Sequence, residues 1–227
     1  MQPKFQAVMF DLDGTLVDSL GDFHHAASTM LDTFGFKAIP KQEVGSFVGN
    51  GQDVFIARCL VHAGAKLTTS ELVKATQIFE AAYDGTNGQY TKKYPGVDEV
   101  LKNLQSSGVK IALCTNRPIK RAHSILKSVG LDQYFDVIAG FESSILPKPD
   151  PGPLNYCLNK LNVKPHAALF VGDSHVDAEA AKRANVRFAF HSGGLGGLNE
   201  EPAAHVFANY ASAAKFMSNK IKTISQT

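Results

Sequence analysis

Short apolar runs alternate with amphipathic segments along most of the chain. Each run is followed by a polar or glycine-containing turn and then by apolar residues at helical spacing, which predicts parallel strands joined by helices. Helices are expected at about 97–107, 119–129, 151–162, 175–184 and 210–221. The runs expected to form five parallel strands are Ala7 to Phe10, Val109 to Cys114, Phe135 to Ala139, Ala168 to Val171 and Arg187 to Phe190. The expected fold class is therefore α/β, with a Rossmann-like parallel sheet in three layers.

One long stretch departs from this rhythm. Between about residues 17 and 92 the pattern indicates amphipathic helices and no strand, for example at 22–34, 52–63 and 70–83. A helical insertion of this length exceeds what a crossover between two strands needs. Residues 17–92 are therefore predicted to form a helical cap domain, and residues 1–16 and 93–227 the α/β core.

Composition and charge limit the classes of function. A net charge of +2 gives no field that would favour nucleic acid or an anionic membrane. The three cysteines are widely spaced and match no metal-binding pattern, which favours a reducing compartment. The sequence shows neither a signal peptide nor an apolar run long enough to span a membrane. We expect a cytoplasmic protein with no nucleic-acid or membrane partner; its oligomeric state stays open.

The first predicted strand ends in two closely spaced carboxylates. Asp11 and Asp13 lie in the run Phe10-Asp11-Leu12-Asp13-Gly14-Thr15-Leu16. Ligands of open parallel sheets bind at the carboxyl ends of strands, and like charges this close raise a pKa or require a cation. A solvated Asp-Gly turn is the alternative. The whole seven-residue run favours a functional site over such a turn.

A second acidic pair follows the fourth predicted strand. Asp173 comes at the strand end, and Asp177 lies four residues later, one helical turn away. Helix capping would explain this pair by itself. Together with the carboxylates of the first strand, it would form an all-oxygen site suited to Mg²⁺.

Positive charge and hydrogen-bond donors are expected at the same edge of the sheet. The second strand ends in Cys114-Thr115-Asn116-Arg117, which supplies a hydroxyl, an amide and a guanidinium. Lys148 lies between Pro147 and Pro149, which stiffen its loop after the third strand. An ordinary surface lysine is the alternative, but the position after a strand favours a role in the site.

These four pieces, in this order, resemble the motifs of the haloacid dehalogenase superfamily. The resemblance is to its phosphatase branch with a helical cap of the C1 type, and it covers essentially the whole chain. Within that branch the chain is similar to bacterial phosphoglycolate phosphatases. The segments that carry this resemblance are 11–19, Val48-Gly49-Asn50-Gly51, Thr115-Asn116, Lys148-Pro149-Asp150-Pro151 and Gly172-Asp173-Ser174.

The resemblance implies a role for each residue of the core motifs. Asp11 would be the nucleophile that forms an aspartyl phosphate, and Asp13 the general acid and base. Thr115 would bind the transferred phosphoryl group, and Lys148 would balance the charge of the carboxylates. Mg²⁺ would be bound by Asp11, by the backbone carbonyl of Asp13 and by Asp173, with Asp177 binding directly or through water.

The resemblance also implies residues that bind the substrate. Asn116 and Arg117 would contribute from the core, and Gly49, Asn50 and Gly51 from a tight loop of the cap whose alternative is an ordinary helix-initiating turn. Arg117 stands where many relatives have lysine, and a planar fork binds anions differently from a point charge. The expected substrate is a small phosphorylated metabolite, first 2-phosphoglycolate, with sugar phosphates, pyrophosphate and nucleoside monophosphates as alternatives.

Single residues distinguish this chain from relatives in the same superfamily that have other activities. A sugar phosphate mutase of the β-phosphoglucomutase type would share both aspartates of the first motif, although Thr15 favours hydrolysis. A dehalogenase would lack Asp13. A phosphonate hydrolase would need a cap lysine, and Lys37 and Lys41 have no context that supports this role. A binding protein without catalysis is disfavoured because all four motifs are present.

Overall fold

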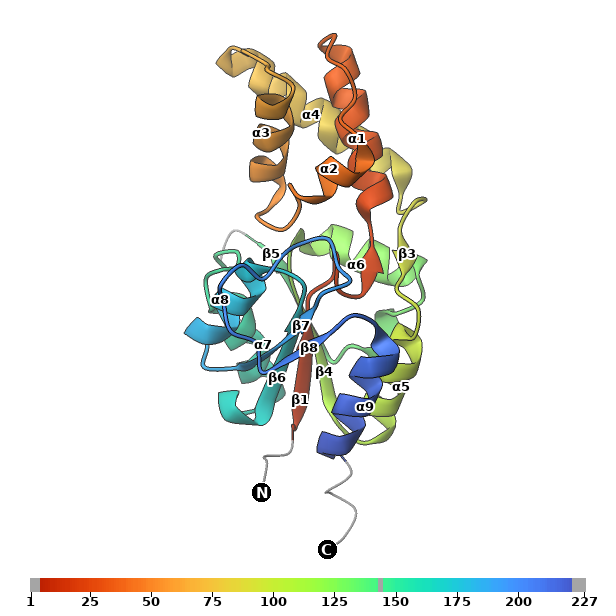
Figure 1. Ribbon diagram of the computed structural model, residues 1–227, viewed down its shortest axis with the longest axis vertical. Helices are drawn as coiled ribbons and strands as arrows, with labels where there is room; N and C mark the ends of the chain where they lie inside the picture. Colours follow the sequence, from red (N-terminus) through yellow and green to blue (C-terminus); the bar gives the residue numbers. More distant parts are fainter. Residues whose placement is uncertain (1–4, 143–144, 222–227) are drawn as a thin grey trace, which may run out of the picture.

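The computed structural model describes residues 5–142 and 145–221. Six parallel strands form one sheet in the order β5-β4-β1-β6-β7-β8 (Figure 1). The predicted α/β fold and its five strands are confirmed, and the sequence missed a sixth strand at the edge, β8. The strands are β1 (Ala7–Phe10), β4 (Lys110–Pro118), β5 (Val137–Phe141), β6 (Ala168–Gly172), β7 (Arg187–His191) and β8 (His205–Phe207).

Alternation along β1 explains the three layers. Val8 and Phe10 pack into one buried cluster with helices α5, α6 and α9, while Ala7 and Met9 pack into a second cluster with α7 and α8. Figure 1 shows the two groups of helices on opposite faces of the sheet. All five predicted core helices are present: α5 (Val97–Ser106), α6 (Ile119–Ser128), α7 (Gly152–Leu161), α8 (His175–Arg183) and α9 (Tyr210–Ile221). Two short 3₁₀ helices lie at Asp132–Tyr134 and Pro165–Ala167.

Four helices follow between β1 and α5 and pack around an apolar cluster of their own. They lie beyond the carboxyl ends of the core strands (Figure 1). The sequence predicted three of them and missed the five-residue helix α2. Their bounds are α1 (Leu20–Thr33), α2 (Lys41–Gly45), α3 (Gln52–His62) and α4 (Thr69–Thr86).

A small antiparallel ribbon joins this helical region to the sheet. Strand β2 (Val17–Asp18) pairs with β3 (Lys92–Lys93). The segment that enters the helical region and the segment that leaves it therefore lie side by side. The prediction of no strand within residues 17–92 was therefore wrong at both ends, because two-residue strands carry no periodic signal. The division into a core and a cap at residues 16 and 93 stays a prediction, and the ribbon lies at those two junctions.

A buried carboxylate ties the start of α1 to the chain that returns towards β3. Asp22 is buried and accepts hydrogen bonds from the Tyr90 N–H at 3.1 Å and from the Thr91 hydroxyl. Both oxygens of this carboxylate are thus compensated, as burial of a charge requires. None of the described helices combines the length and the apolar character needed to cross a membrane.

Candidate active site

The loop after β1 is built around Asp11. The Asp11 N–H donates to Val171 O of β6 at 2.9 Å, and Leu12 O accepts the N–H groups of three residues further along the loop. Gly14 has φ +78°, and a Cβ at this position would lie 2.0 Å from Asp173 Oδ2, so the loop requires glycine. The N–H groups of Leu12 and Asp13 donate to no other described residue. They are therefore available to an anion at the carboxyl end of β1.

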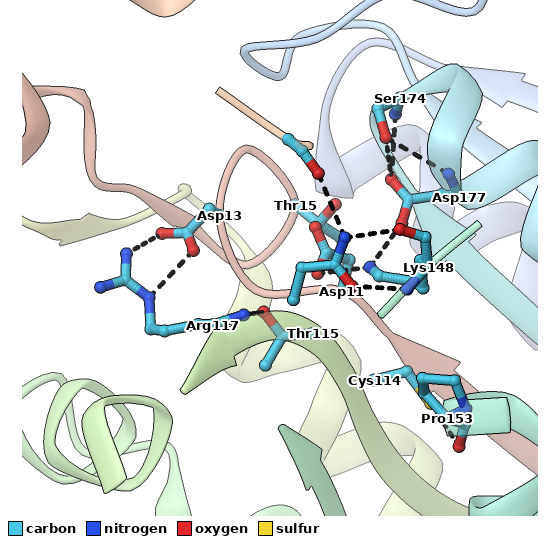
Figure 2. A network of polar contacts seen from close by, with 12 residues as sticks. Asp11, Asp13, Thr15, Cys114, Thr115, Arg117, Lys148, Pro153, Ser174 and Asp177 are labelled. Carbon is cyan, nitrogen blue, oxygen red and sulfur yellow. Dashed lines mark hydrogen bonds and ion pairs between the residues drawn. The ribbon is translucent and has the colours of Figure 1, made fainter. Parts of the chain in front are cut away.

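Lys148 lies beside Asp11 because Asn116 holds its backbone. Asn116 Oδ1 accepts the Lys148 N–H at 2.7 Å, and Asn116 Nδ2 donates to Lys148 O at 2.9 Å. The Lys148 ammonium is buried, 2.8 Å from Asp11 Oδ1 and 2.6 Å from Asp177 Oδ1 (Figure 2). Burial lowers the pKa of this group, but the two carboxylates raise it above its ordinary value. Lys148 therefore carries its charge in the site.

Three buried carboxylates lie together at this point. Oxygen atoms of Asp11, Asp173 and Asp177 lie within 4.8 Å of one another. Burial raises the pKa of Asp11 to about 7, with Lys148 opposing and Asp177 adding to the shift. Burial and the charges of Asp177 and Asp11 raise the pKa of Asp173 to about 8. One ammonium does not offset three carboxylates, so the cluster favours a further cation, and hard oxygen ligands suit Mg²⁺.

The three carboxylates differ in how many of their oxygens are already engaged. Asp177 Oδ1 contacts Lys148, and its Oδ2 accepts the Ser174 hydroxyl at 2.6 Å in the capping box of α8. Asp173 Oδ2 accepts the N–H groups of Leu195 and Gly196, each at 2.8 Å. Asp11 Oδ2, by contrast, accepts no hydrogen bond from any residue that the structure describes. This oxygen of Asp11 is the one open to a reacting group.

Asp13 lies outside this cluster and turns towards Arg117. Arg117 Nε is 3.0 Å from Asp13 Oδ2, and a second guanidinium nitrogen contacts Oδ1, which also accepts the Ser19 hydroxyl. In Figure 2 the Asp13 carboxylate points towards Arg117 and not towards Asp11. The side chain of Asp13 is thus not near the metal cluster, although the prediction concerned its backbone carbonyl. Sequence reasoning did not foresee this ion pair.

Two aromatic rings from the helical region enclose Arg117. Its guanidinium lies 5.3 Å from the centre of the Phe23 ring and 5.0 Å from that of Tyr83, and it donates to the Tyr83 hydroxyl. Burial raises the pKa of Tyr83 to about 12, so its hydroxyl stays neutral. The sequence analysis missed both rings because an aromatic residue at helical spacing usually belongs to a core. No sequence signal could have singled them out, because their contact with Arg117 exists only in the fold.

These side chains line one pocket of about 60 Å³ between the strand ends and the helical region. Such a volume holds a few water-sized groups. It contains most of the residues predicted for the site, but Asn50 and Asp173 are not among its lining residues. The helical region also closes on it through Gly49 O, which accepts Asn116 Nδ2 at 3.3 Å. The predicted residues that line the pocket are Asp11, Asp13, Gly49, Gly51, Thr115, Asn116, Arg117, Lys148 and Asp177.

Comparison with known proteins assigns the family. The model of the haloacid dehalogenase-like hydrolase family matches residues 8–191, a span that contains every residue predicted for the site. The chain belongs to this family. Its phosphoglycolate phosphatase relatives from Psychrobacter arcticus and Cereibacter sphaeroides are both 38% identical. The matches cover 80% of both this chain and the Psychrobacter protein, and 82% of this chain and 85% of the Cereibacter protein.

A solved structure of another family member agrees in fold. A predicted phosphoglycolate phosphatase from Haemophilus somnus 129pt superposes with a TM-score of 0.88 at 30% identity, over 93% of this chain and 97% of the other. The haloacid dehalogenase-like fold expected from the motifs is therefore confirmed. This chain is a phosphatase of the family and an enzyme of the phosphoric monoester hydrolase class, as the sequence predicted.

Proposed function

We propose that this phosphatase hydrolyses a small phosphate monoester by forming an aspartyl phosphate on Asp11, with 2-phosphoglycolate as the first candidate substrate and glycolate as its product. The observation that carries the proposal is the Asp11 oxygen that accepts no hydrogen bond from the described residues, on a side chain that lines the pocket and whose other oxygen lies 2.8 Å from the buried ammonium of Lys148. The names of the two similar relatives and the small volume of the pocket support the choice of substrate.

In the first half-reaction Asp11 Oδ2 attacks phosphorus, and the bond to the glycolate oxygen breaks. Asp13, in its protonated form, gives its proton to that leaving oxygen. The Thr115 hydroxyl and the N–H groups of Leu12 and Asp13 would bind the phosphoryl oxygens. The ammonium of Lys148 keeps the carboxylate and the phosphate close despite their like charges.

In the second half-reaction Asp13 acts as the base. Its carboxylate takes a proton from a water molecule, whose oxygen attacks the phosphorus of the aspartyl phosphate. The bond between phosphorus and Asp11 breaks, which releases inorganic phosphate and restores the free carboxylate. Asp13 is then protonated again and ready for the next substrate.

The acidic cluster fits Mg²⁺ as the cofactor. Asp11, Asp173 and the backbone carbonyl of Asp13 would bind the ion, and both oxygens of Asp177 are already engaged, which favours a contact of Asp177 through water. When bound, Mg²⁺ would supply positive charge that stabilises the phosphoryl oxygens during transfer.

The test is phosphate release from a panel of phosphorylated metabolites with Mg²⁺ or with excess chelator. We expect rapid, metal-dependent release from 2-phosphoglycolate and loss of turnover by at least about 10³-fold in Asp11→Asn. Labelled phosphate should attach to the wild-type chain in a form that hydroxylamine removes, which identifies an acyl phosphate. The exposed Asp32→Asn is the matched control and should keep full activity.

Two outcomes would contradict the proposal. Full phosphatase activity in Asp11→Asn would exclude this nucleophile. Slow release from every compound, with glucose 6-phosphate appearing from β-glucose 1-phosphate, would instead identify a mutase.

A further inference from the structure

Arg117 is a buried cation whose counter-ion is the proposed general acid. The residue is 6% exposed, and its fork holds the Asp13 carboxylate through two nitrogens. The rings of Phe23 and Tyr83 restrict the guanidinium from the helical region, and the Arg117 N–H donates to Thr115 Oγ1 at 3.2 Å. The guanidinium therefore has a fixed position in the same pocket as the proposed phosphoryl-binding residue.

This arrangement is incompatible with the chemistry proposed for Asp13. The guanidinium fork holds the Asp13 carboxylate in one place through two nitrogens, so Asp13 cannot turn towards Asp11 while this pair is intact. In Figure 2 the Asp13 carboxylate points towards Arg117 and not towards Asp11, the residue that would receive the phosphoryl group. Asp13 must therefore leave Arg117 before it can act.

Departure of Asp13 alone would leave the guanidinium buried without a counter-ion, which is costly. A second anion is needed to take its place. A planar carboxylate fits the same two nitrogens, and 2-phosphoglycolate carries one close to its ester oxygen. Arg121, the other arginine of the pocket, pairs with Asp84 at 2.7 Å and not with Asp13, so a carboxylate bound there would not release the proposed general acid.

We propose that Arg117 binds the carboxylate of the substrate, and that this carboxylate replaces Asp13 on the guanidinium and so releases Asp13 for catalysis. Arg117 is then the residue that determines specificity for short phosphate monoesters bearing a carboxylate. A monoester without a second anion leaves Asp13 bound to Arg117 and reacts slowly. The inference rests on the proposed function and specifies the substrate class of the same site.

The experiment compares 2-phosphoglycolate with its neutral amide, phosphoglycolamide, which keeps the size and the ester bond. For each enzyme the measured quantity is the ratio of kcat/KM for the acid to kcat/KM for the amide, with Mg²⁺ present. We expect the wild-type enzyme to prefer the acid by at least about 100-fold, because a neutral group cannot replace Asp13 on the guanidinium. Arg117→Met should bring this ratio near one, since neither substrate then finds the guanidinium and Asp13 is free for both.

Two further variants make the test specific. Arg117→Lys keeps a positive charge without the fork, so the ratio should fall between those of the wild type and Arg117→Met. Arg121→Met removes the neighbouring arginine. It should change kcat/KM for the acid and for the amide by the same factor, so that their ratio stays within about twofold of the wild-type ratio.

The outcomes separate this inference from the proposed function. If the wild type hydrolyses acid and amide equally well, Arg117 does not bind the carboxylate and the inference fails. It fails likewise if both Arg117 variants lower kcat/KM for the acid and for the amide by the same factor. Metal-dependent phosphatase activity through Asp11 would stand in either case. If the wild type hydrolyses neither compound but another monoester, the proposed substrate is wrong, and the inference fails with it.

Discussion

At the scale of single residues, the three carboxylates of the acidic cluster repel one another more than the ammonium of Lys148 alone can offset. The pKa of Asp173 is raised to about 8, above that of Asp11, because Asp173 is buried and faces the charges of Asp177 and Asp11. Its ordinary value is 3.8, so the folded protein binds this proton more tightly than the unfolded chain does. Ionisation of Asp173 therefore costs folding free energy.

The raised pKa values of these carboxyls make the folded protein less stable as the pH rises. Between pH 3.8 and about 8 the folded state holds more protons than the unfolded state at this position, so stability falls as the pH rises through that window. Asp11, with a pKa raised to about 7, acts in the same direction. In chelator, the melting temperature of the wild type should therefore decrease from about pH 5 to pH 8.

Asp173→Asn tests this prediction at one position. The amide keeps the shape and can still accept the N–H groups of Leu195 and Gly196 through its oxygen, but it cannot ionise. In chelator at pH 8 the variant should melt at a higher temperature than the wild type, and its melting temperature should depend less on pH. Addition of Mg²⁺ should raise the melting temperature of the wild type and not that of the variant. An unchanged pH slope in Asp173→Asn would show that this carboxyl is not the cause.

At the scale of elements, the loop of Lys148 depends on the end of β4. Asn116 of β4 makes two hydrogen bonds to the Lys148 backbone, of 2.7 and 2.9 Å. It also contacts the helical region through Gly49 O at 3.3 Å. One amide thus aligns the ammonium with Asp11 and touches the opposite wall of the pocket.

Asn116→Ala should therefore lower kcat although it removes neither the nucleophile nor the ammonium. A displacement of Lys148 by about 1 Å costs on the order of 100-fold in rate. The measurement is steady-state kinetics with 2-phosphoglycolate, alongside a melting curve that confirms folding. The exposed Asn155→Ala is the matched control and should behave as the wild type. Equal kcat values for Asn116→Ala and the wild type would mean that the loop holds its position without this amide.

How far the sequence predicted these elements depends on the kind of signal each one leaves. Buried strands such as β6 and amphipathic helices such as α5 repeat their apolar residues over a full element, so periodicity located them. The short strands β2, β3 and β8 have two or three residues each and leave no period. They are fixed by pairing with segments distant in sequence.

The residues of the candidate site also divide into those that a sequence pattern predicted and those that it missed. Asp11, Lys148 and Asp173 were found because each follows a predicted strand, and parallel topology brings strand ends to one edge. Tyr83 was missed because it lies on the helix α4 with an apolar neighbour one turn earlier and reads as a core residue. Its contact with Arg117 joins two regions whose relative placement no local pattern encodes.

At the scale of the whole molecule, the helical region covers the pocket that the core creates. Gly49 and Tyr83 line it from one side, and Lys148 and Thr115 line it from the other. Arg121 of α6 contacts Asp84 of α4 across the same boundary. We predict that substrate entry and product release require these walls to separate, and that their closure expels water.

A reversible disulfide across the boundary tests this separation. A Cβ placed on Gly49 would lie 4.0 Å from Ser174 Cβ, within the range of about 3.5–4.5 Å that disulfides require. The double variant Gly49→Cys with Ser174→Cys should therefore form a bond between the helical region and the start of α8. The native cysteines Cys59, Cys114 and Cys157 are all buried, so they compete little for this reaction.

Because φ at Gly49 is +116°, a cysteine there is strained, and the informative comparison is between the oxidised and reduced forms of the same double variant. Oxidation should lower kcat/KM for 2-phosphoglycolate by at least about tenfold, since the walls can no longer part, and a reductant should restore it. Ser174→Cys alone should respond to neither treatment. If the oxidised double variant turned over as fast as its reduced form, substrate would reach Asp11 without separation of the two regions, and the pocket would be permanently open to solvent on another side.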